Sequence, residues 1–164
     1  EEVAGIYVTL GERAKAIEEY RRLIVEKPAE AGRFRYRIAA EYMKANDFDR
    51  ARAEFGEILR SSPRSPLRPE IHYQLAAMYH LEGRLEDAME AYDTVISEFP
   101  DHMLSIEARL GVASALEESG RLAEALERFV ALEGDYPNKE VVRIRIASIE
   151  ERLKKGPAPR KKKK

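Results

Sequence analysis

Hydrophobic side chains recur every three or four residues along most of this chain, and polar side chains occupy the positions between them. One such stripe consists of Ile71, Leu75, Met78 and Tyr79. A second stripe runs from Leu85 to Ile96. This spacing places the apolar residues on one face of a helix. The pattern therefore predicts two consecutive amphipathic helices in this part of the chain.

A glycine and a proline mark the ends of these two helices. Gly83 separates the stripes, at a place where a residue in the left-handed conformation can end the first helix. Pro100 follows the second stripe; it lacks an amide proton and disfavours helical geometry in the residue before it. The segment 68–104 is therefore predicted to form a helical hairpin.

The same arrangement recurs along the chain with a period of 37 residues. Four columns share this spacing: Pro63, Pro100 and Pro137; Ala51, Ala88 and Ala125; Phe55, Tyr92 and Phe129; and Asn46, Gly83 and Gly120. An earlier copy, offset by 35 from the second, consists of Gly11, Ala16, Tyr20 and Pro28. Independent columns with one period indicate a repeat protein. We expect four hairpins over residues 1–30, 31–67, 68–104 and 105–138, the first of them shortened at its start.

The alanine and aromatic columns predict how each hairpin packs. Ala51, Ala88 and Ala125 lie in the middle of the second helices, where a small side chain lets the partner helix approach closely. The aromatic residue one turn later fills the wider space beyond this crossing. We therefore expect both columns to be buried.

Residues 139–155 predict one more amphipathic helix, which closes the array. Its apolar stripe consists of Val142, Ile146, Ile149 and Leu153, and its opposite side bears Arg143, Arg145, Glu150, Glu151 and Arg152. Such a helix covers the last hairpin and presents charge to water. Glycine and two prolines follow, so residues 156–164 are expected to form a solvated, disordered basic tail.

These hairpins resemble the tetratricopeptide repeat, a helix–turn–helix unit of about 34 residues. The resemblance covers roughly residues 1–138. The matching residues of the third repeat are Leu75, Ala76, Tyr79, Gly83, Ala88, Tyr92, Ile96 and Pro100, and those of the fourth are Val112, Ala113, Gly120, Ala125, Phe129, Leu132 and Pro137. The family's first-helix tryptophan is missing throughout, and Leu116 replaces the first-helix tyrosine of the fourth repeat. The resemblance implies an all-α, right-handed superhelical solenoid of antiparallel helix hairpins, with about 3.5–4 repeats and a C-terminal capping helix.

The residues that join the repeats resemble one subclass of this family. Asp135, Tyr136, Pro137 and Asn138 form a motif of an acidic residue, an aromatic residue, proline and a turn residue. This motif and the longer period are similar to those of bacterial envelope scaffolds, which are periplasmic and often carry a lipid on an upstream cysteine. The resemblance implies a bacterial protein of the periplasm or cell envelope, and the cytoplasm is the alternative.

The composition offers little chemistry for catalysis. The chain of 164 residues contains no cysteine, no tryptophan and three histidines. No serine lies in a nucleophile elbow, and no glycine-rich loop suits a phosphate. His72 and His80 lie eight residues apart on one helix, about 12 Å along its axis, which is too far to share a metal ion. We therefore expect no enzyme activity, no small-molecule substrate, no cofactor and no metal site.

The charges divide the chain into an acidic body and a basic end. Residues 154–164 carry seven basic and no acidic side chains, which leaves 22 basic and 30 acidic residues, a net charge of −8, on residues 1–153. Clustered lysines are attracted to anionic lipid surfaces by about 1 kcal/mol each. The alternative function is therefore a module whose tail tethers it to an anionic membrane or to nucleic acid, although the acidic body disfavours nucleic acid. No apolar run approaches the roughly 18 residues of a membrane span, so we expect membrane contact only through this tail or an anchor upstream of Glu1.

The first helices of the repeats are expected to line a concave groove, because the resemblance places them on the inner face of the solenoid. The candidate peptide-binding residues are Arg33, Tyr36, Met43, Lys44, Tyr73, His80, Glu107, Leu110 and Glu117. Tyrosine and methionine form adaptable anchor sites for peptides. Tyr36 and Tyr73 can instead fill the space between adjacent first helices, and both interpretations stay open. We expect a non-catalytic scaffold that binds a protein or peptide segment in this groove, as part of a bacterial assembly.

Overall fold

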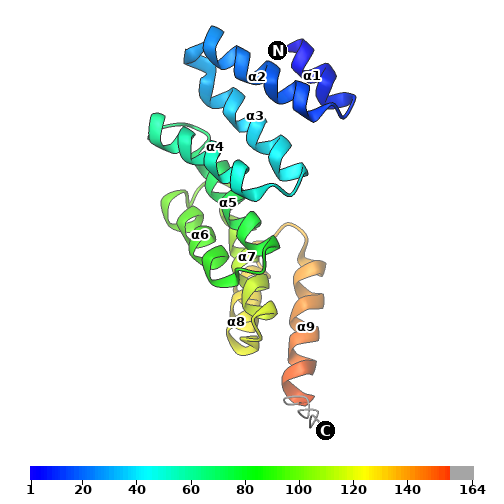
Figure 1. Ribbon diagram of the computed structural model, residues 1–164. Coiled ribbons are helices and arrows are strands. Elements are labelled where there is room, and N and C mark those ends of the chain that lie inside the picture. The colour runs from blue at the N-terminus through cyan, green and yellow to red at the C-terminus, as the bar shows by residue number, and fades with distance from the viewer. Residues whose placement is uncertain (156–164) are drawn as a thin grey trace. The chain divides into compact units, whose positions relative to one another are not determined.

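The computed structural model describes residues 1–155, and all regular structure within them is helical (Figure 1). In chain order the helices are α1 (Glu2–Thr9), α2 (Arg13–Glu26), the short 3-10 helix η1 (Pro28–Glu30), α3 (Ala31–Lys44), α4 (Phe48–Ser61), α5 (Arg68–Leu81), α6 (Leu85–Glu98), α7 (Met103–Glu118), α8 (Leu122–Leu132) and α9 (Lys139–Lys155). The all-α prediction is confirmed. The basic tail at residues 156–164, with its predicted disorder and its tethering role, lies outside the described residues. None of the described helices is long and apolar enough to cross a membrane.

Each hairpin turns at the residue for which the sequence predicts a left-handed conformation. Gly11, Gly83 and Gly120 have φ angles of 73°, 72° and 82°, and Asn46 has a φ of 55°. Most side chains are strained in this region, whereas glycine adopts it freely and asparagine tolerates it. This column therefore ends the first helix of each hairpin and lets the second begin within two or three residues.

The proline column follows the second helices, with one difference in the last hairpin. The helices α2, α4 and α6 each end two residues before their proline, whereas α8 ends at Leu132, five residues before Pro137. Gly134 stands 37 residues after Ser97, which is still inside α6. Glycine in a helix interior is less favourable than alanine by about 1 kcal/mol, so the last turn of α8 does not form.

The first of two compact units runs from Glu1 to Ile71. Within it α1 packs on α2, α2 on α3, and α3 on α4. A core cluster joins the first three helices; its members are Ala4, Ala16, Tyr20, Leu23, Phe34 and Ile38. The rings of Tyr20 and Phe34 stack with their centroids 6.3 Å apart. Successive hairpins of this unit therefore share a core, as expected of stacked repeats.

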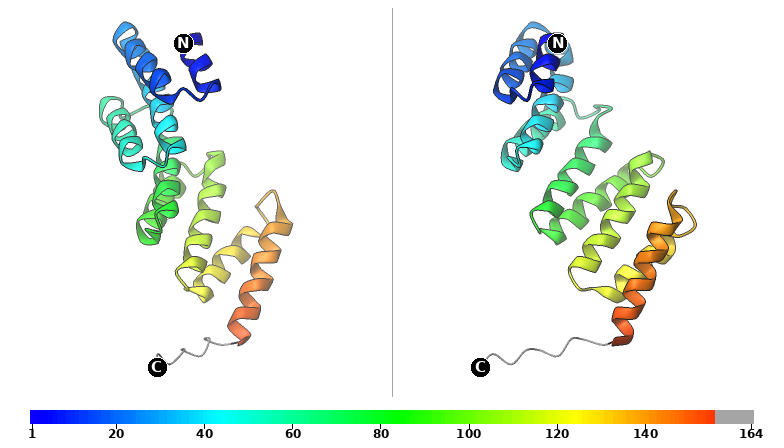
Figure 2. Two further views of the ribbon diagram at one scale, coloured as in Figure 1. Left: turned by 45° about the vertical axis from the view of Figure 1, so that its right-hand side comes forward. Right: turned by 90° about the vertical axis from the view of Figure 1, so that its right-hand side faces the viewer.

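The second compact unit begins at His72. Within it α6 packs on α7, α7 on α8, and α8 on α9, so that neighbours in sequence are neighbours in space (Figure 2). The core includes Ala88, Tyr92, Val95, Val112, Leu116, Ala125, Phe129, Leu132, Val142 and Ile149. The alanine and aromatic columns are buried here and, through Ala51 and Phe55, in the first unit as well. The sequence-based prediction of their burial is confirmed.

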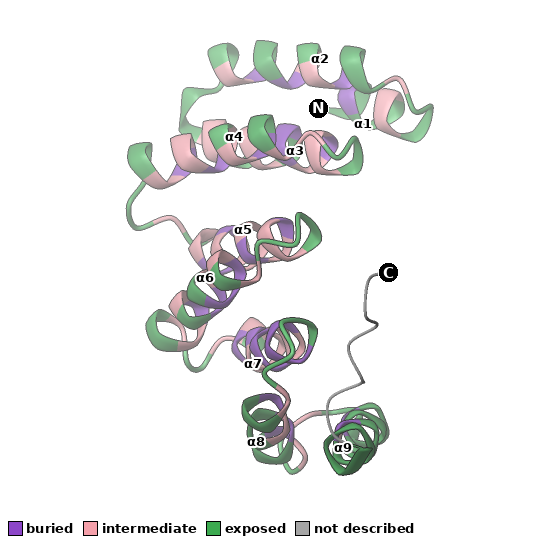
Figure 3. Ribbon diagram, turned by 60° about the horizontal axis from the view of Figure 1, so that its bottom comes forward, coloured by how far each residue is buried: buried purple, intermediate pink, exposed green. Residues whose placement is uncertain are grey.

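The last helix, α9, buries only part of its predicted apolar stripe. Val142 and Ile149 are fully buried and Ile146 is half-buried. Leu153, the last residue of the predicted stripe, is 42% exposed. Leu153 lies in the last turn of α9, where it lines an open pocket beside the turn between α7 and α8. Figure 3 shows that most of α9 is exposed to solvent.

Candidate functional site

The candidate residues fall into two sets, one in each compact unit. In the N-terminal unit, the α3 face consists of Arg33, Tyr36, Met43 and Lys44. In the C-terminal unit, the α5–α7 face consists of Tyr73, His80, Glu107, Leu110 and Glu117. Each helix brings its own members together because they recur at helical spacing.

Tyr36 is the aromatic residue of the α3 face, and its ring rests on a second-helix ring of the same hairpin. The ring centroids of Tyr36 and Phe55 lie 5.4 Å apart with their planes tilted by 52°. Phe55 is fully buried, whereas Tyr36 is half-buried. Such tilted pairs are favourable beyond their buried area. Phe55 therefore holds the Tyr36 ring in place, while part of the Tyr36 side chain remains open to solvent.

The cationic groups of the α3 face are already compensated by carboxylates. Arg33 forms ion pairs with Glu30, at 3.0 Å, and with Glu1. The Lys44 ammonium donates to the carboxylate of Glu41 at 2.6 Å, and Glu41 is buried. These pairs orient both long side chains along α3. A ligand of this face therefore meets ordered ion pairs and not free cations.

Tyr73 repeats the Tyr36 arrangement in the C-terminal unit. Its ring centroid lies 5.7 Å from that of Tyr92, and the His80 ring approaches Tyr92 edge-on at 6.4 Å. Burial raises the pKa of Tyr92 to about 12, and the neighbouring Tyr73 and Glu118 add to the effect. Burial, with a contribution from Glu107, also raises the pKa of Tyr73. Both hydroxyl groups therefore remain protonated at neutral pH.

A glycine of α7 makes room for the Tyr92 ring. A Cβ atom added to Gly111 would lie 2.5 Å from Cζ of Tyr92 and within 2.8 Å of two further ring atoms. Carbon atoms do not approach so closely without displacement, so any side chain at this position forces the ring or the helix to move. The sequence analysis missed this contact; its signal was a glycine in the middle of a predicted helix, which requires a packing reason.

Two carboxylates of α7 bind partners across the α5–α7 face. Glu107 accepts a hydrogen bond from the Tyr136 hydroxyl at 3.0 Å. Glu118 lies 3.0 Å from Nε2 of His80, which links α7 to α5. Leu110 is half-buried between these polar groups. The face thus offers two half-buried side chains, Tyr73 and Leu110, that pack against the same core, and carboxylates of α7 beside them.

Glu117 holds α9 in place. Its carboxylate is buried and accepts hydrogen bonds from Arg145 at 3.3 Å and from Arg152 at 2.7 Å. The sequence analysis placed Glu117 on the open face and these arginines on the solvent side of the last helix. The missed signal is their spacing, since residues seven apart lie on one side of a helix.

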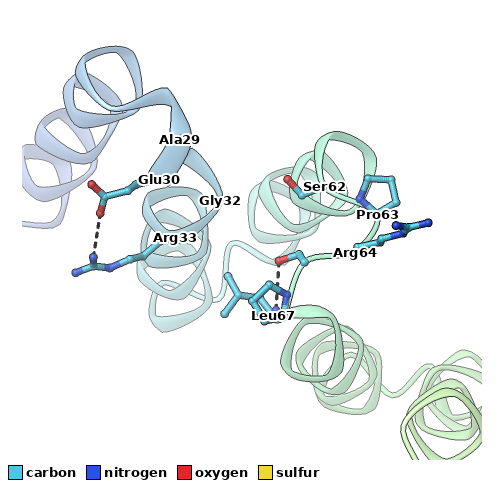
Figure 4. A pocket seen from close by; sticks show the side chains of 10 residues that line it. Ala29, Glu30, Gly32, Arg33, Ser62, Pro63, Arg64 and Leu67 are labelled. Carbon is cyan, nitrogen blue, oxygen red and sulfur yellow. Dashed lines mark hydrogen bonds and ion pairs between the residues drawn. The ribbon is translucent and has the colours of Figure 1, made fainter.

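An open pocket of about 890 Å³ lies in the N-terminal unit; Arg33 of the α3 face lines it, and Tyr36 does not. It is lined by Ala29, Glu30, Gly32, Arg33, Ser62, Pro63, Arg64, Ser65, Pro66 and Leu67. Figure 4 shows that these residues come from η1 and the start of α3 and from the loop after α4, with the Glu30–Arg33 ion pair at one side. Sequence patterns did not predict it, because two turns far apart in the sequence form its walls. No group of three or more His, Cys, Asp or Glu residues within 1–155 is placed to hold a metal ion.

Two family models described as tetratricopeptide repeat match the chain, at residues 36–102 and 79–145. No curated protein matches it. Among solved structures, MamA of AMB-1 superposes with a TM-score of 0.67 at 19% identity, over 93% of this chain and 80% of that chain. YrrB, a TPR protein with an unusual peptide-binding site, gives a TM-score of 0.66 at 18% identity, over 93% and 74%. At these identities the likeness establishes a shared helical-repeat fold.

Proposed function

Because the chain belongs to the tetratricopeptide repeat family, we propose that it is a non-catalytic scaffold that binds a protein or peptide segment through the α3 face and the α5–α7 face. Proteins of this family typically act as binding scaffolds and not as enzymes. YrrB, which shares the fold, has a peptide-binding site. This supports a protein partner for the present chain as well.

The observation that carries the proposal is the placement of Tyr36 and Tyr73. Each is half-buried and rests on a buried aromatic ring of the following helix, Phe55 or Tyr92. A tyrosine held in one orientation loses little side-chain entropy when a ligand covers it. Tyrosine is also among the residue types that contribute most to binding energy at interfaces. Both rings are therefore suited to anchor apolar side chains of a bound segment.

The polar groups around these anchors would orient such a segment. Glu107 and Glu118 lie on either side of Leu110 along α7; Glu107 already accepts a hydrogen bond from Tyr136, and Glu118 already contacts His80. Paired groups at the rim add specificity more than affinity. The apolar anchors would then supply most of the binding energy.

Hydrogen exchange in the presence of a selected peptide tests this function. Peptides are first selected from a displayed random library against the chain, and amide exchange is then compared with and without the tightest of them. Binding across the proposed faces slows exchange in α3, α5 and α7. Protection confined to the second helices, or to the loop that lines the 890 Å³ pocket, would contradict it.

We further propose that the scaffold belongs to a bacterial envelope assembly. The 37-residue period and the motif from Asp135 to Asn138 support this assignment. Proximity labelling in the native cell tests it, since an envelope scaffold labels envelope proteins and a cytoplasmic one does not.

A further inference from the structure

The first helix, α1, is apolar on nearly all sides. Ala4 faces the core and is fully buried. On the outer side Val3, Ile6 and Leu10 are 47%, 56% and 64% exposed. Their spacing of three and four residues places them on one stripe. A helix that is hydrophobic all round is normally covered on both sides, so this stripe lacks a partner within the described chain.

The repeat register shows what kind of partner the stripe accepts. The first and second repeats are offset by 35 residues, so Val3 aligns with Ile38 and Ile6 aligns with Glu41. The counterparts in α3 and α7 are Ile38, Glu41, Val112 and Ala115. All four are buried, and α3 and α7 each pack on the second helix of the preceding hairpin. Val3 and Ile6 therefore occupy positions that a helix covers elsewhere in the array, whereas the counterpart of Leu10 in the second repeat, Ala45, is exposed.

The described chain offers one helix with a matching exposed surface, at its other end. On α9, Val141 and Ile144 are 41% and 59% exposed and lie one turn apart. Residues 139–155 include six basic and three acidic side chains, a net charge of +3. Residues 1–10 include two glutamates and no basic side chain, a net charge of −2. Part of this charge is already compensated, since Glu1 pairs with Arg33, Arg143 with Glu133, and Arg145 and Arg152 with Glu117. With Glu117 and Glu133 counted, the net charge around α9 is +1, so the two surfaces remain apolar at their centres and opposite in sign.

We propose that α1 of one copy of this chain docks against α9 of a second copy. Opposite charges favour this pairing, whereas two α1 surfaces or two α9 surfaces would bring like charges together. Because the contact joins two different surfaces, it leaves one of each free and continues head to tail along a row of copies. The contact is small, so association is weak and depends on concentration.

Sedimentation of the full chain over a range of about 1 µM to 1 mM tests the proposal. The wild-type chain shows an average mass that rises with concentration. Ile6→Glu and Ile144→Glu each weaken association at least about tenfold, because each places a charge in the apolar contact. Both positions are more than half exposed, so the circular dichroism spectrum and melting temperature stay close to those of the wild type.

An equal mixture of the two variants separates head-to-tail pairing from the alternatives. The Ile6→Glu copy keeps its α9 surface, and the Ile144→Glu copy keeps its α1 surface. One contact can therefore form between the two variants, and association ends at the dimer. Val25→Glu, on an 81% exposed residue of α2, is the control and associates like the wild type. The proposal is overturned if the wild type stays monomeric, if Ile144→Glu associates normally, or if Val25→Glu is equally impaired.

Discussion

The carboxylate of Glu117 on α7 accepts a hydrogen bond of 2.7 Å from Arg152 on α9, across 35 residues of sequence. Arg145 reaches the other carboxylate oxygen at 3.3 Å. Two kinds of contact therefore hold the last helix. Val142 and Ile149 are buried against the core, and Glu117 binds Arg145 and Arg152.

Replacing Glu117 should loosen α9. Glu117→Ala removes two charge-assisted hydrogen bonds and should lower the free energy of unfolding by about 1–3 kcal/mol. Amide exchange in α9 should accelerate more than exchange in α6. The control is Glu118→Gln, on an exposed residue that pairs with His80, and its effect should stay below about 0.5 kcal/mol. Equal effects of the two variants would mean that the Glu117 pair does not hold α9.

Gly111→Ala should destabilise the C-terminal unit. Its Cβ atom would meet the Tyr92 ring at 2.5 Å, and overpacking of this kind costs about 1–3 kcal/mol. Gly5→Ala is the matched control, since Gly5 lies inside α1 with no atom within 4 Å of the added carbon. There the gain in helix propensity should stabilise the chain by about 0.5–1 kcal/mol. Chemical unfolding of both variants measures the change in the free energy of unfolding, which should be a loss for Gly111→Ala and a gain for Gly5→Ala.

Ala88→Leu should be costly for a similar reason. Ala88 is fully buried as the fourth residue of α6, nearer the start of the helix than the predicted mid-helix position. A branched side chain there forces the neighbouring helices apart. We expect a loss of about 1–3 kcal/mol and a lower melting temperature. Ala123→Leu on the exposed side of α8 is the control and should leave the melting temperature unchanged. A melting temperature of Ala88→Leu within error of the wild type would contradict the close crossing.

The buried tyrosines should make the fold sensitive to high pH. Burial raises the pKa of Tyr92 to about 12, from about 10 in an unfolded chain. The folded state then holds its proton more tightly, so stability is full below pH 10 and falls as the pH rises toward 12. The loss is at most about 1.4 kcal/mol per pH unit for this group. Urea unfolding between pH 8 and pH 11.5 should show a smaller loss in Tyr92→Phe; identical slopes would contradict this account.

Much of the fold could be predicted because each hairpin repeats the same local signals. The column of Asn46 and the three glycines predicted the turns, and the structure has positive φ angles at all four positions. The alanine and aromatic columns predicted burial in the same way. The turns and the buried positions depend on a few neighbouring residues, so the sequence pattern predicts them. The early end of α8 depends on Gly134 alone, which the repeat columns do not include.

The candidate site was harder to predict because its details depend on pairs of residues far apart in the sequence. A helical register places Glu117 on a face of α7, but it does not reveal that Arg145 and Arg152 reach it. In the same way, register placed Tyr36 on the α3 face without showing that its ring rests on Phe55. Long side chains choose partners from several neighbouring helices, and only the packed structure identifies which ones they meet.

The binding role of the two tyrosines is most directly tested by replacing them together. In Tyr36→Ala with Tyr73→Ala, affinity for a peptide selected against the wild-type chain should fall at least about thirtyfold, the loss expected for a buried aromatic anchor worth about 2 kcal/mol. The control is Tyr79→Ala, which removes a half-buried tyrosine that packs on Arg84 and lines a pocket with residues of α6. Affinity and melting temperature are measured on the same samples. The account predicts a large loss of affinity in the double variant alone; a large drop in its melting temperature with unchanged affinity would contradict it.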